Sequence, residues 1–149
     1  MTDPSAPTGR PSFDETARMP GHLLRRCQQI AVSIFLRECR DFDLTPLQFA
    51  VLSALDHHGP IDQVGLGGLT ALDRTTIGVV VRKLEARGLT AHRRSDKDRR
   101  SKMITISEAG RDLLEAAAGA VATAQARVVA PLSAAERTQL LDLLARIAD

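Results

Sequence analysis

The chain has 149 residues, of which 44% are hydrophobic, and its formal net charge is +2. This length suits one hydrophobic core and is too short for two ordinary domains. Its only aromatic residues are four phenylalanines. Because proteins that bind RNA or single strands rely on aromatic stacking, this composition disfavours those two classes.

Targeting signals and disulfides are not expected. No apolar segment reaches the roughly 20 residues of a membrane span, and the N-terminus lacks the apolar core of a signal peptide. We therefore expect a cytoplasmic protein. Cys27 and Cys39 fall on one expected helix, about 18 Å apart at ~1.5 Å per residue, so they cannot pair within it. Buried structural thiols are the favoured interpretation, with redox sensing as the alternative.

The N-terminal part predicts a tail followed by a long helix. The tail spans about residues 1–15 and is rich in Pro, Ser and Thr, which favours no fixed structure. The helix is expected to begin at Phe13 or Thr16 and to end near Asp41. Its apolar residues recur at helical spacing and form one stripe: Leu23, Leu24, Cys27, Ile30, Ala31, Ile34 and Phe35.

The next helix has a clear start signal. Thr45 and Gln48 have the spacing of a capping box, and Pro46 occupies the first helical position. The helix is expected to stop at residues 57–60, which read His-His-Gly-Pro. Adjacent histidines point in different directions on a helix and no third ligand is spaced nearby, so we expect no metal site and no cofactor.

A helix-turn-helix is expected over residues 62–87. Asp62 caps a short helix that Gly65, Gly67 and Gly68 weaken by up to ~1 kcal/mol each relative to Ala. Asp73 caps the second helix, over 73–87, and Gly88 ends it. In such motifs the second helix enters the major groove of DNA by its N-terminal residues, which here are Arg74, Thr75, Thr76 and Gly78.

A basic hairpin follows this second helix. Strands are expected over 89–94 and 102–106, flanking a charged turn over 95–101. Between residues 82 and 102, nine Lys and Arg stand against three acidic residues, a local charge of +6, so the rest of the chain carries −4. A positive stripe on an acidic body favours phosphate contact, although a solvated hairpin is the alternative. The cations are Arg82, Lys83, Arg87, Arg93, Arg94, Lys97, Arg99, Arg100 and Lys102.

Two more helices complete the chain. Ser107 caps one that runs to about Val129, and Ser133 starts a final helix that carries Leu140, Leu141, Leu144 and Ile147. Neither terminal helical region is needed for a winged helix, so both are expected to pair with a second copy across a two-fold axis. The fold class is therefore mainly α with a small β-hairpin wing. We expect a single domain over 16–149, with the winged helix-turn-helix at about 45–106 and dimerisation helices at about 16–41 and 107–148.

From about residue 18 onward the chain resembles the MarR family of winged-helix transcriptional regulators. Residues 44–55, 73–89 and 98–110 carry the resemblance. The family's wing signature is an Asp, an Arg two residues later, an aliphatic residue, a Thr or Ser, and a Gly. The matching residues are Asp98, Arg100, Ile106, Ser107 and Gly110, with Ser in place of the commoner Thr.

The resemblance implies a homodimer on a palindromic operator in double-stranded DNA. It implies a recognition helix at 73–87, Arg100 in the minor groove, Asp98 paired with it, and Arg99 and Lys97 beside it. Members commonly carry an Arg where this chain has Val79, and the three glycines before residue 69 are unusual. Both departures bear on how the motif meets its bases.

Many members are repressors released by small phenolic or carboxylate ligands. The local similarity over 22–36 suggests the branch that controls the breakdown of aromatic acids. We expect a buried Arg26 beside His22 to accept a carboxylate, while neutral phenols and coenzyme A thioesters are the alternatives. By resemblance, the effector site consists of His22, Arg26 and Gln29 on the first helix opposite Phe49 and Ser53 on the next.

The main hypothesis is therefore a ligand-responsive repressor that binds duplex DNA. A redox-responsive regulator that uses Cys27 or Cys39 is one alternative, and a winged-helix module for protein interaction is another. We do not expect an enzyme, because the sequence has no nucleophile–base set, phosphate-binding Gly loop or paired carboxylates.

Overall fold

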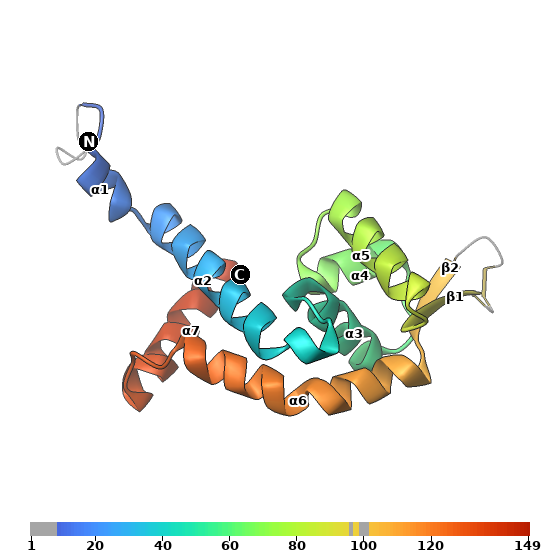
Figure 1. The fold of residues 1–149 in the computed structure, drawn as a ribbon. Helices are drawn as coiled ribbons and strands as arrows, with labels where there is room; N and C mark the ends of the chain where they lie inside the picture. Colours follow the sequence, from blue (N-terminus) through green and yellow to red (C-terminus); the bar gives the residue numbers. More distant parts are fainter. Residues whose placement is uncertain (1–8, 96, 99–101) are drawn as a thin grey trace.

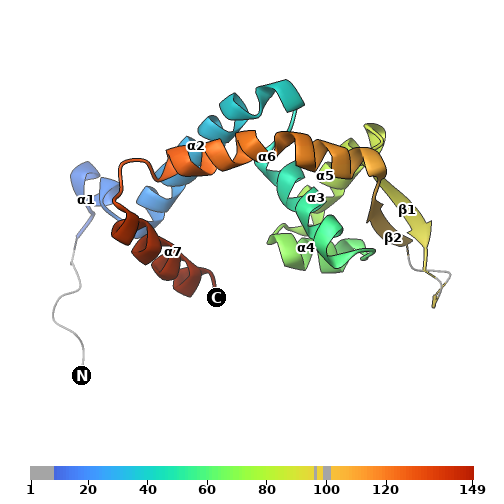
Figure 2. The same ribbon diagram turned by 90° about the horizontal axis from the view of Figure 1, so that it is seen from below.

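The computed structural model describes residues 9–95, 97–98 and 102–149. The described chain is mainly helical with one two-stranded antiparallel hairpin, which confirms the predicted fold class. Helix α6 (Glu108–Val128) runs from the base of the hairpin to the turn before the C-terminal helix and joins two lobes (Figure 1; Figure 2). One lobe holds residues 46–86 and the hairpin, and the other holds residues 13–38 and 134–148.

The prediction of a single long N-terminal helix is wrong. Two helices, α1 (Phe13–Ala17) and α2 (Pro20–Glu38), replace it, and α1 starts inside the expected tail. Met19 between them is extended, at φ −68° and ψ 142°. The reason is Pro20, which has no N–H and disfavours a helical conformation in the residue before it. After α2 the chain makes a 3-10 turn, η1 (Arg40–Phe42).

The apolar stripe of α2 faces away from the core of its own chain. Leu23 and Ile30 are 45% and 52% exposed. Cys27 is also exposed, so the expectation that both thiols are buried is wrong for Cys27. Only the end of the helix reaches the core, where Phe35 and Cys39 are buried. Burial there, followed by the charge of Glu38, raises the pKa of the Cys39 thiol.

Helix α3 (Pro46–His58) begins as predicted. The Thr45 hydroxyl accepts from Gln48 N, and the Gln48 side chain accepts from Thr45 N, both at 3.2 Å. This capping box also places Gln48 among the buried residues. The start of α3, the first helix of the lobe that carries the hairpin, is therefore fixed by the local capping box that the sequence predicts.

Helices α4 (Gln63–Thr70) and α5 (Arg74–Ala86) form the expected helix-turn-helix. Helix α4 forms despite its glycines, and one of them has a packing role. A methyl group on Gly67 would lie 3.0 Å from the carbonyl oxygen of Leu72, so glycine lets the turn close tightly against the helix. The turn itself passes through Ala71, which is left-handed at φ 53°.

The hairpin strands are β1 (Thr90–Arg94) and β2 (Lys102–Ile106), paired in a register that sets Thr90 opposite Ile106. Strand β1 is one residue shorter than expected, since Leu89 lies outside the ladder. Ile61 adds an isolated bridge to Ile104, with N···O distances of 3.2 and 2.8 Å. An isolated bridge of one residue pair leaves no alternating pattern in the sequence, so the sequence does not predict this bridge.

The core lies where α3, α4, α5 and β2 meet α6. Helix α7 (Ala134–Ala148) has no buried residue, and its Leu141 and Ile147 are 64% and 68% exposed. Among the described residues no single helix is long and apolar enough to cross a membrane; only the bent pair α4 and α5, taken together, meets that test of length and composition. The main buried side chains are Leu44, Val51, Leu52, Leu55, Leu66, Ile77, Val81, Leu84 and Ile104.

Candidate nucleic-acid interface

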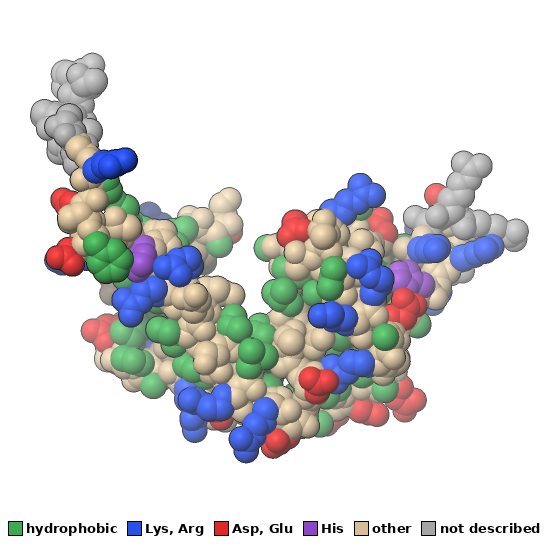
Figure 3. Space-filling model, turned by 45° about the horizontal axis from the view of Figure 1, so that its top comes forward, with side chains coloured by type: hydrophobic (Ala, Val, Ile, Leu, Met, Phe, Trp, Pro, Cys, Tyr) green, Lys and Arg blue, Asp and Glu red, His purple; other side chains and the backbone are tan. Residues whose placement is uncertain are grey.

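Helix α5 has one buried face and one cationic face. Ile77, Val81 and Leu84 are buried, whereas Arg74 and Arg82 are exposed. This division follows from apolar residues at a 3.6-residue period. Figure 3 shows Lys and Arg side chains over the lobe that carries α5 and the hairpin. The exposed face of α5 therefore has the charge and the shape to meet a DNA groove.

The first turn of α5 is fixed by its cap. Asp73 accepts from Thr76 N at 2.9 Å and from the Thr76 hydroxyl at 2.6 Å. These two hydrogen bonds, the hydroxyl first, hold the pKa of Asp73 below its usual range. Because the Thr76 hydroxyl is engaged and half-buried, Thr75 is the exposed threonine of the predicted pair.

Gly78 is buried rather than exposed. Side chains from two other positions cover it, since a methyl group there would lie 3.3 Å from Gln63 Nε2 and 3.4 Å from Arg82 Nη1. Gln63 is absent from the predicted DNA-binding residues. The sequence signal that identifies Gln63 is its position on the first turn of α4, immediately after the cap residue Asp62.

The hairpin extends the basic face. Arg93, Arg94, Lys97 and Lys102 are exposed. His92 ties β1 to the recognition helix, because its Nδ1 lies 3.0 Å from both carboxylate oxygens of Glu85. This hydrogen bond is the main cause that lowers the pKa of Glu85.

The predicted wing tip lies mostly outside the described residues. Arg99 and Arg100 are not among them, so their contact with the minor groove and the Asp98–Arg100 pair stay predictions. Asp98 and Lys97 are described and exposed.

Arg87 is exposed, but its guanidinium is engaged by the chain's own backbone. Its Nη1 donates to the carbonyl oxygen of Asp43 at 2.6 Å, and its Nη2 donates to that of Phe42 at 3.3 Å. Arg87 Nη1 also lies 3.4 Å from Gln48 Oε1. The guanidinium therefore binds the chain's own backbone, between the end of α5 and the turn after α2.

The predicted effector residues do not converge on one cavity. Arg26, Gln29 and Ser53 are exposed, while His22 and Phe49 are half-buried. Phe49 packs against Phe35, with ring centroids 5.9 Å apart. These residues therefore form no enclosed site within the single chain.

Arg25, rather than Arg26, joins His22 to Gln29. Its Nη2 lies 3.4 Å from His22 Nδ1, and its Nη1 donates to Gln29 Oε1 at 3.3 Å. The spacings i−3 and i+4 are those of neighbours on one helix face, so the sequence contained this signal.

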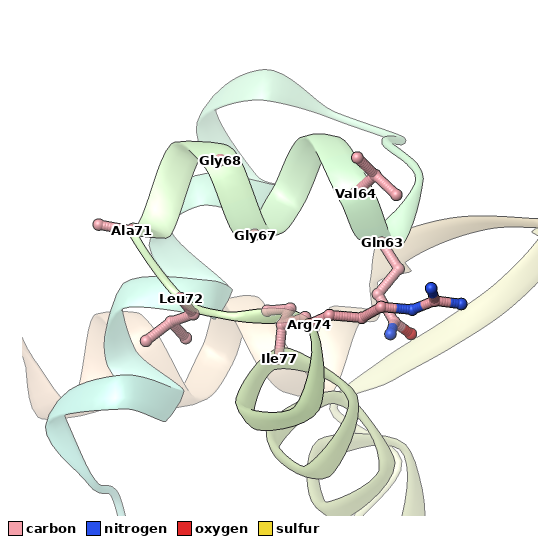
Figure 4. Close-up of a pocket in the computed structure, with 8 residues that line it drawn as sticks. All are labelled: Gln63, Val64, Gly67, Gly68, Ala71, Leu72, Arg74 and Ile77. Carbon is pink, nitrogen blue, oxygen red and sulfur yellow. The ribbon is translucent and has the colours of Figure 1, made fainter.

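Two hollows border the recognition helix. One, of about 600 Å³, lies between α4 and the start of α5 (Figure 4). The other, of about 410 Å³, lies between α2, α3 and α5, and we call it the interlobe groove. Within the described ranges no three metal-binding side chains (His, Cys, Asp, Glu) are grouped so that they could hold an ion. The groove is lined by Gln28, Val32, Leu36, Thr45, Pro46, Leu47, Gln48, Thr76, Val79, Val80 and Lys83.

Comparisons with known proteins agree with this architecture. Residues 42–101 match the model of the MarR family. NicR of Pseudomonas putida, an HTH-type transcriptional repressor, is 36% identical over 148 residues, which cover 99% of this chain and 93% of NicR.

Two solved structures are similar over almost the whole chain. BpsR of Bordetella bronchiseptica, whose DNA binding is regulated by 6-hydroxynicotinic acid, matches with a TM-score of 0.86 and 34% identity, covering 95% of this chain and 99% of BpsR. The repressor CouR, bound to a 23-mer DNA duplex, matches with a TM-score of 0.84 and 32% identity, covering 95% of this chain and 100% of CouR. The chain therefore belongs to the MarR family of winged helix-turn-helix, DNA-binding transcriptional repressors.

Proposed function

We propose that this protein is a homodimeric repressor that binds a palindromic operator and is released by a small aromatic carboxylate. Each copy would offer α5 to the major groove and its basic hairpin to the flanking phosphates. The exposed apolar residues of α2 and α7 would be buried between the two copies. The duplex bound to CouR supports the DNA partner.

One observation carries the effector part of this proposal: the recognition helix itself forms a wall of the interlobe groove. Thr76, Val79 and Lys83 of α5 face Val32 and other residues of α2 across it. A ligand in this groove would contact the dimerisation helix and the DNA-reading helix together. A ligand that binds one arrangement of the two helices better than the other shifts the population toward that arrangement.

The chemistry of the interlobe groove suits an aromatic acid. Val32, Leu36 and Val79 give it apolar walls, and Lys83 supplies an ammonium group for a carboxylate. Arg25 precedes Gln28 by three residues and so lies on the same face of α2. The action of 6-hydroxynicotinic acid on BpsR supports a ligand of this class.

This proposal moves the effector site from the predicted residues to the interlobe groove, and Ser53 has no part in it. Arg25 takes the place of Arg26 as the carboxylate partner, with His22 and Gln29 holding its guanidinium. Phe49 contributes by packing beneath α2, against Phe35.

The experiment is a thermal-shift series with 6-hydroxynicotinate, 4-hydroxybenzoate, benzoate and neutral phenol. A ligand at 100 times its Kd stabilises the native state by about 2.7 kcal/mol. We expect at least one acid, and not phenol, to raise the unfolding midpoint and to release bound duplex. Arg25→Gln should lose this response, and the neighbouring Arg26→Gln should keep it. Loss of the response in Arg26→Gln alone, or an absence of any response to acids, would contradict the proposed effector site.

A further inference from the structure

At residue 78 the recognition helix has no side chain of its own. Gly78 stands one turn after Arg74 and one turn before Arg82. The Gln63 amide lies over it, as close as 3.3 Å to where a Cβ of residue 78 would be. A side chain from α4 therefore occupies the place that an α5 side chain would take in the absence of this glycine.

The position of Gln63 is fixed by the backbone of α4. It is the first residue of that helix, directly after Asp62, whose carboxylate accepts from Gly65 N at 2.7 Å. Gln63 and Arg74 line the same hollow, and in Figure 4 their side chains point to the same side of the helix-turn-helix. The cap therefore directs Gln63 toward the start of the recognition helix.

The Gln63 amide is available to a ligand. Within the part of the chain that the structure describes, its side chain makes no hydrogen bond, and the residue is half-buried. An amide has two N–H donors and one carbonyl acceptor. Arg74 lines the same hollow as Gln63, and Arg82 Nη1 approaches the same position of Gly78; both arginines are exposed.

We infer that Gln63 of α4 reads a base pair of the operator, at the place between Arg74 and Arg82 where α5 itself has only Gly78. A glutamine amide pairs bidentately with N6 and N7 of adenine, and a guanidinium pairs with O6 and N7 of guanine. The base that Gln63 reads is therefore adenine. This inference rests on the DNA binding of the proposed function and assigns part of its sequence preference to a residue outside the recognition helix.

The test is selection of duplexes from a random library by the native protein, Gln63→Ala and Leu69→Ala. We expect the native protein to require an A·T pair at a position where Gln63→Ala accepts any pair. Affinity of Gln63→Ala for the native-selected duplex should fall roughly tenfold or more, while its affinity for unrelated duplex and its salt dependence stay unchanged. Leu69, exposed on the same helix but outside the hollow, is the matched control and should select as the native protein does.

Gly78→Met tests the same inference from the recognition helix. Methionine is a better helix former than glycine, and its side chain would displace the Gln63 amide. We expect the same loss of preference as in Gln63→Ala, with an unfolding midpoint no lower than that of the native protein.

Three results would overturn the inference: Gln63→Ala selecting the native sequence with native affinity, Gly78→Met selecting that sequence, or Gln63→Ala losing affinity equally for all duplexes. The last would mark Gln63 as a phosphate contact. A native protein that selects no sequence would instead contradict the proposed function.

Discussion

Arg87, just beyond the recognition helix, donates a 2.6 Å hydrogen bond to the backbone carbonyl of Asp43, 44 residues earlier in the chain. Asp43 follows η1 in a left-handed conformation, at φ 47°. The contact joins the end of α5 to the end of the α2 segment. It therefore links α5 to the end of the α2 segment without passing through the core.

Replacing Arg87 tests whether this residue acts through its hydrogen bonds to the backbone or through a contact with DNA. Arg87→Gln should lower operator affinity and reduce the free energy of unfolding by about 1 kcal/mol, since the exposed hydrogen bonds from a charged donor to the carbonyls of Asp43 and Phe42 are lost. The slope of log affinity against log salt should stay unchanged. Arg82→Gln is the matched control, and it should reduce that slope by about 0.9. An equal change of slope in both variants would mean that Arg87 binds phosphate.

The Glu85–His92 contact predicts a pH dependence of stability. Because the pKa of Glu85 is lowered in the folded state, its contribution is present above the ordinary glutamate value of 4.5 and is lost as pH falls through the folded pKa. The difference in unfolding midpoint between the native protein and Glu85→Gln should therefore be full above about pH 5 and vanish in stronger acid. Glu115→Gln, on the exposed face of α6, is the control. A difference that persists unchanged down to pH 3 would contradict this contact.

Gly110 is needed for close packing at the start of α6. A methyl group there would clash with the carbonyl oxygen of Leu89 and would lie 2.7 Å from Ile106 Cγ1. Gly110→Ala should therefore destabilise the fold by about 1–3 kcal/mol. Gly119→Ala, at an open position on the same helix, should stabilise it by up to ~1 kcal/mol. Chemical denaturation measures both, and a neutral Gly110→Ala would refute the predicted clash.

The exposed apolar residues of α2 and α7 should hold the dimer. Ile30→Glu and Leu141→Glu each put a charge at a position whose apolar side chain is more than half exposed in the single chain. Both should give monomers that retain helical content and lose operator affinity, because a buried unpaired charge is costly. Val64→Glu, on a still more exposed residue of α4, should remain dimeric. Sedimentation distinguishes these outcomes, and dimers of both interface variants would place the interface elsewhere.

Most of the fold was predictable because its start signals are local. Thr45, Asp62, Asp73, Ser107 and Ser133 each precede a helix and accept a hydrogen bond from its first turn. The helix break at Pro20 was equally local, because the expected apolar stripe begins only at Leu23, after the proline.

The site was less predictable because its contacts are between elements. Gln63 meets Gly78, and Arg87 meets Asp43, only after the helices pack. The exposure of Cys27 has another cause. An apolar stripe on a helix can pack against a second copy of the chain or against the chain's own core, and the periodicity of the sequence does not distinguish the two cases.

Two copies of this chain are expected to hold one duplex through α5 and the hairpin. Sedimentation of the protein with its selected duplex tests it most directly. We predict a complex of two protomers per duplex that dissociates steeply as salt rises. A complex with a single protomer, or one whose affinity does not change with salt, would contradict the account.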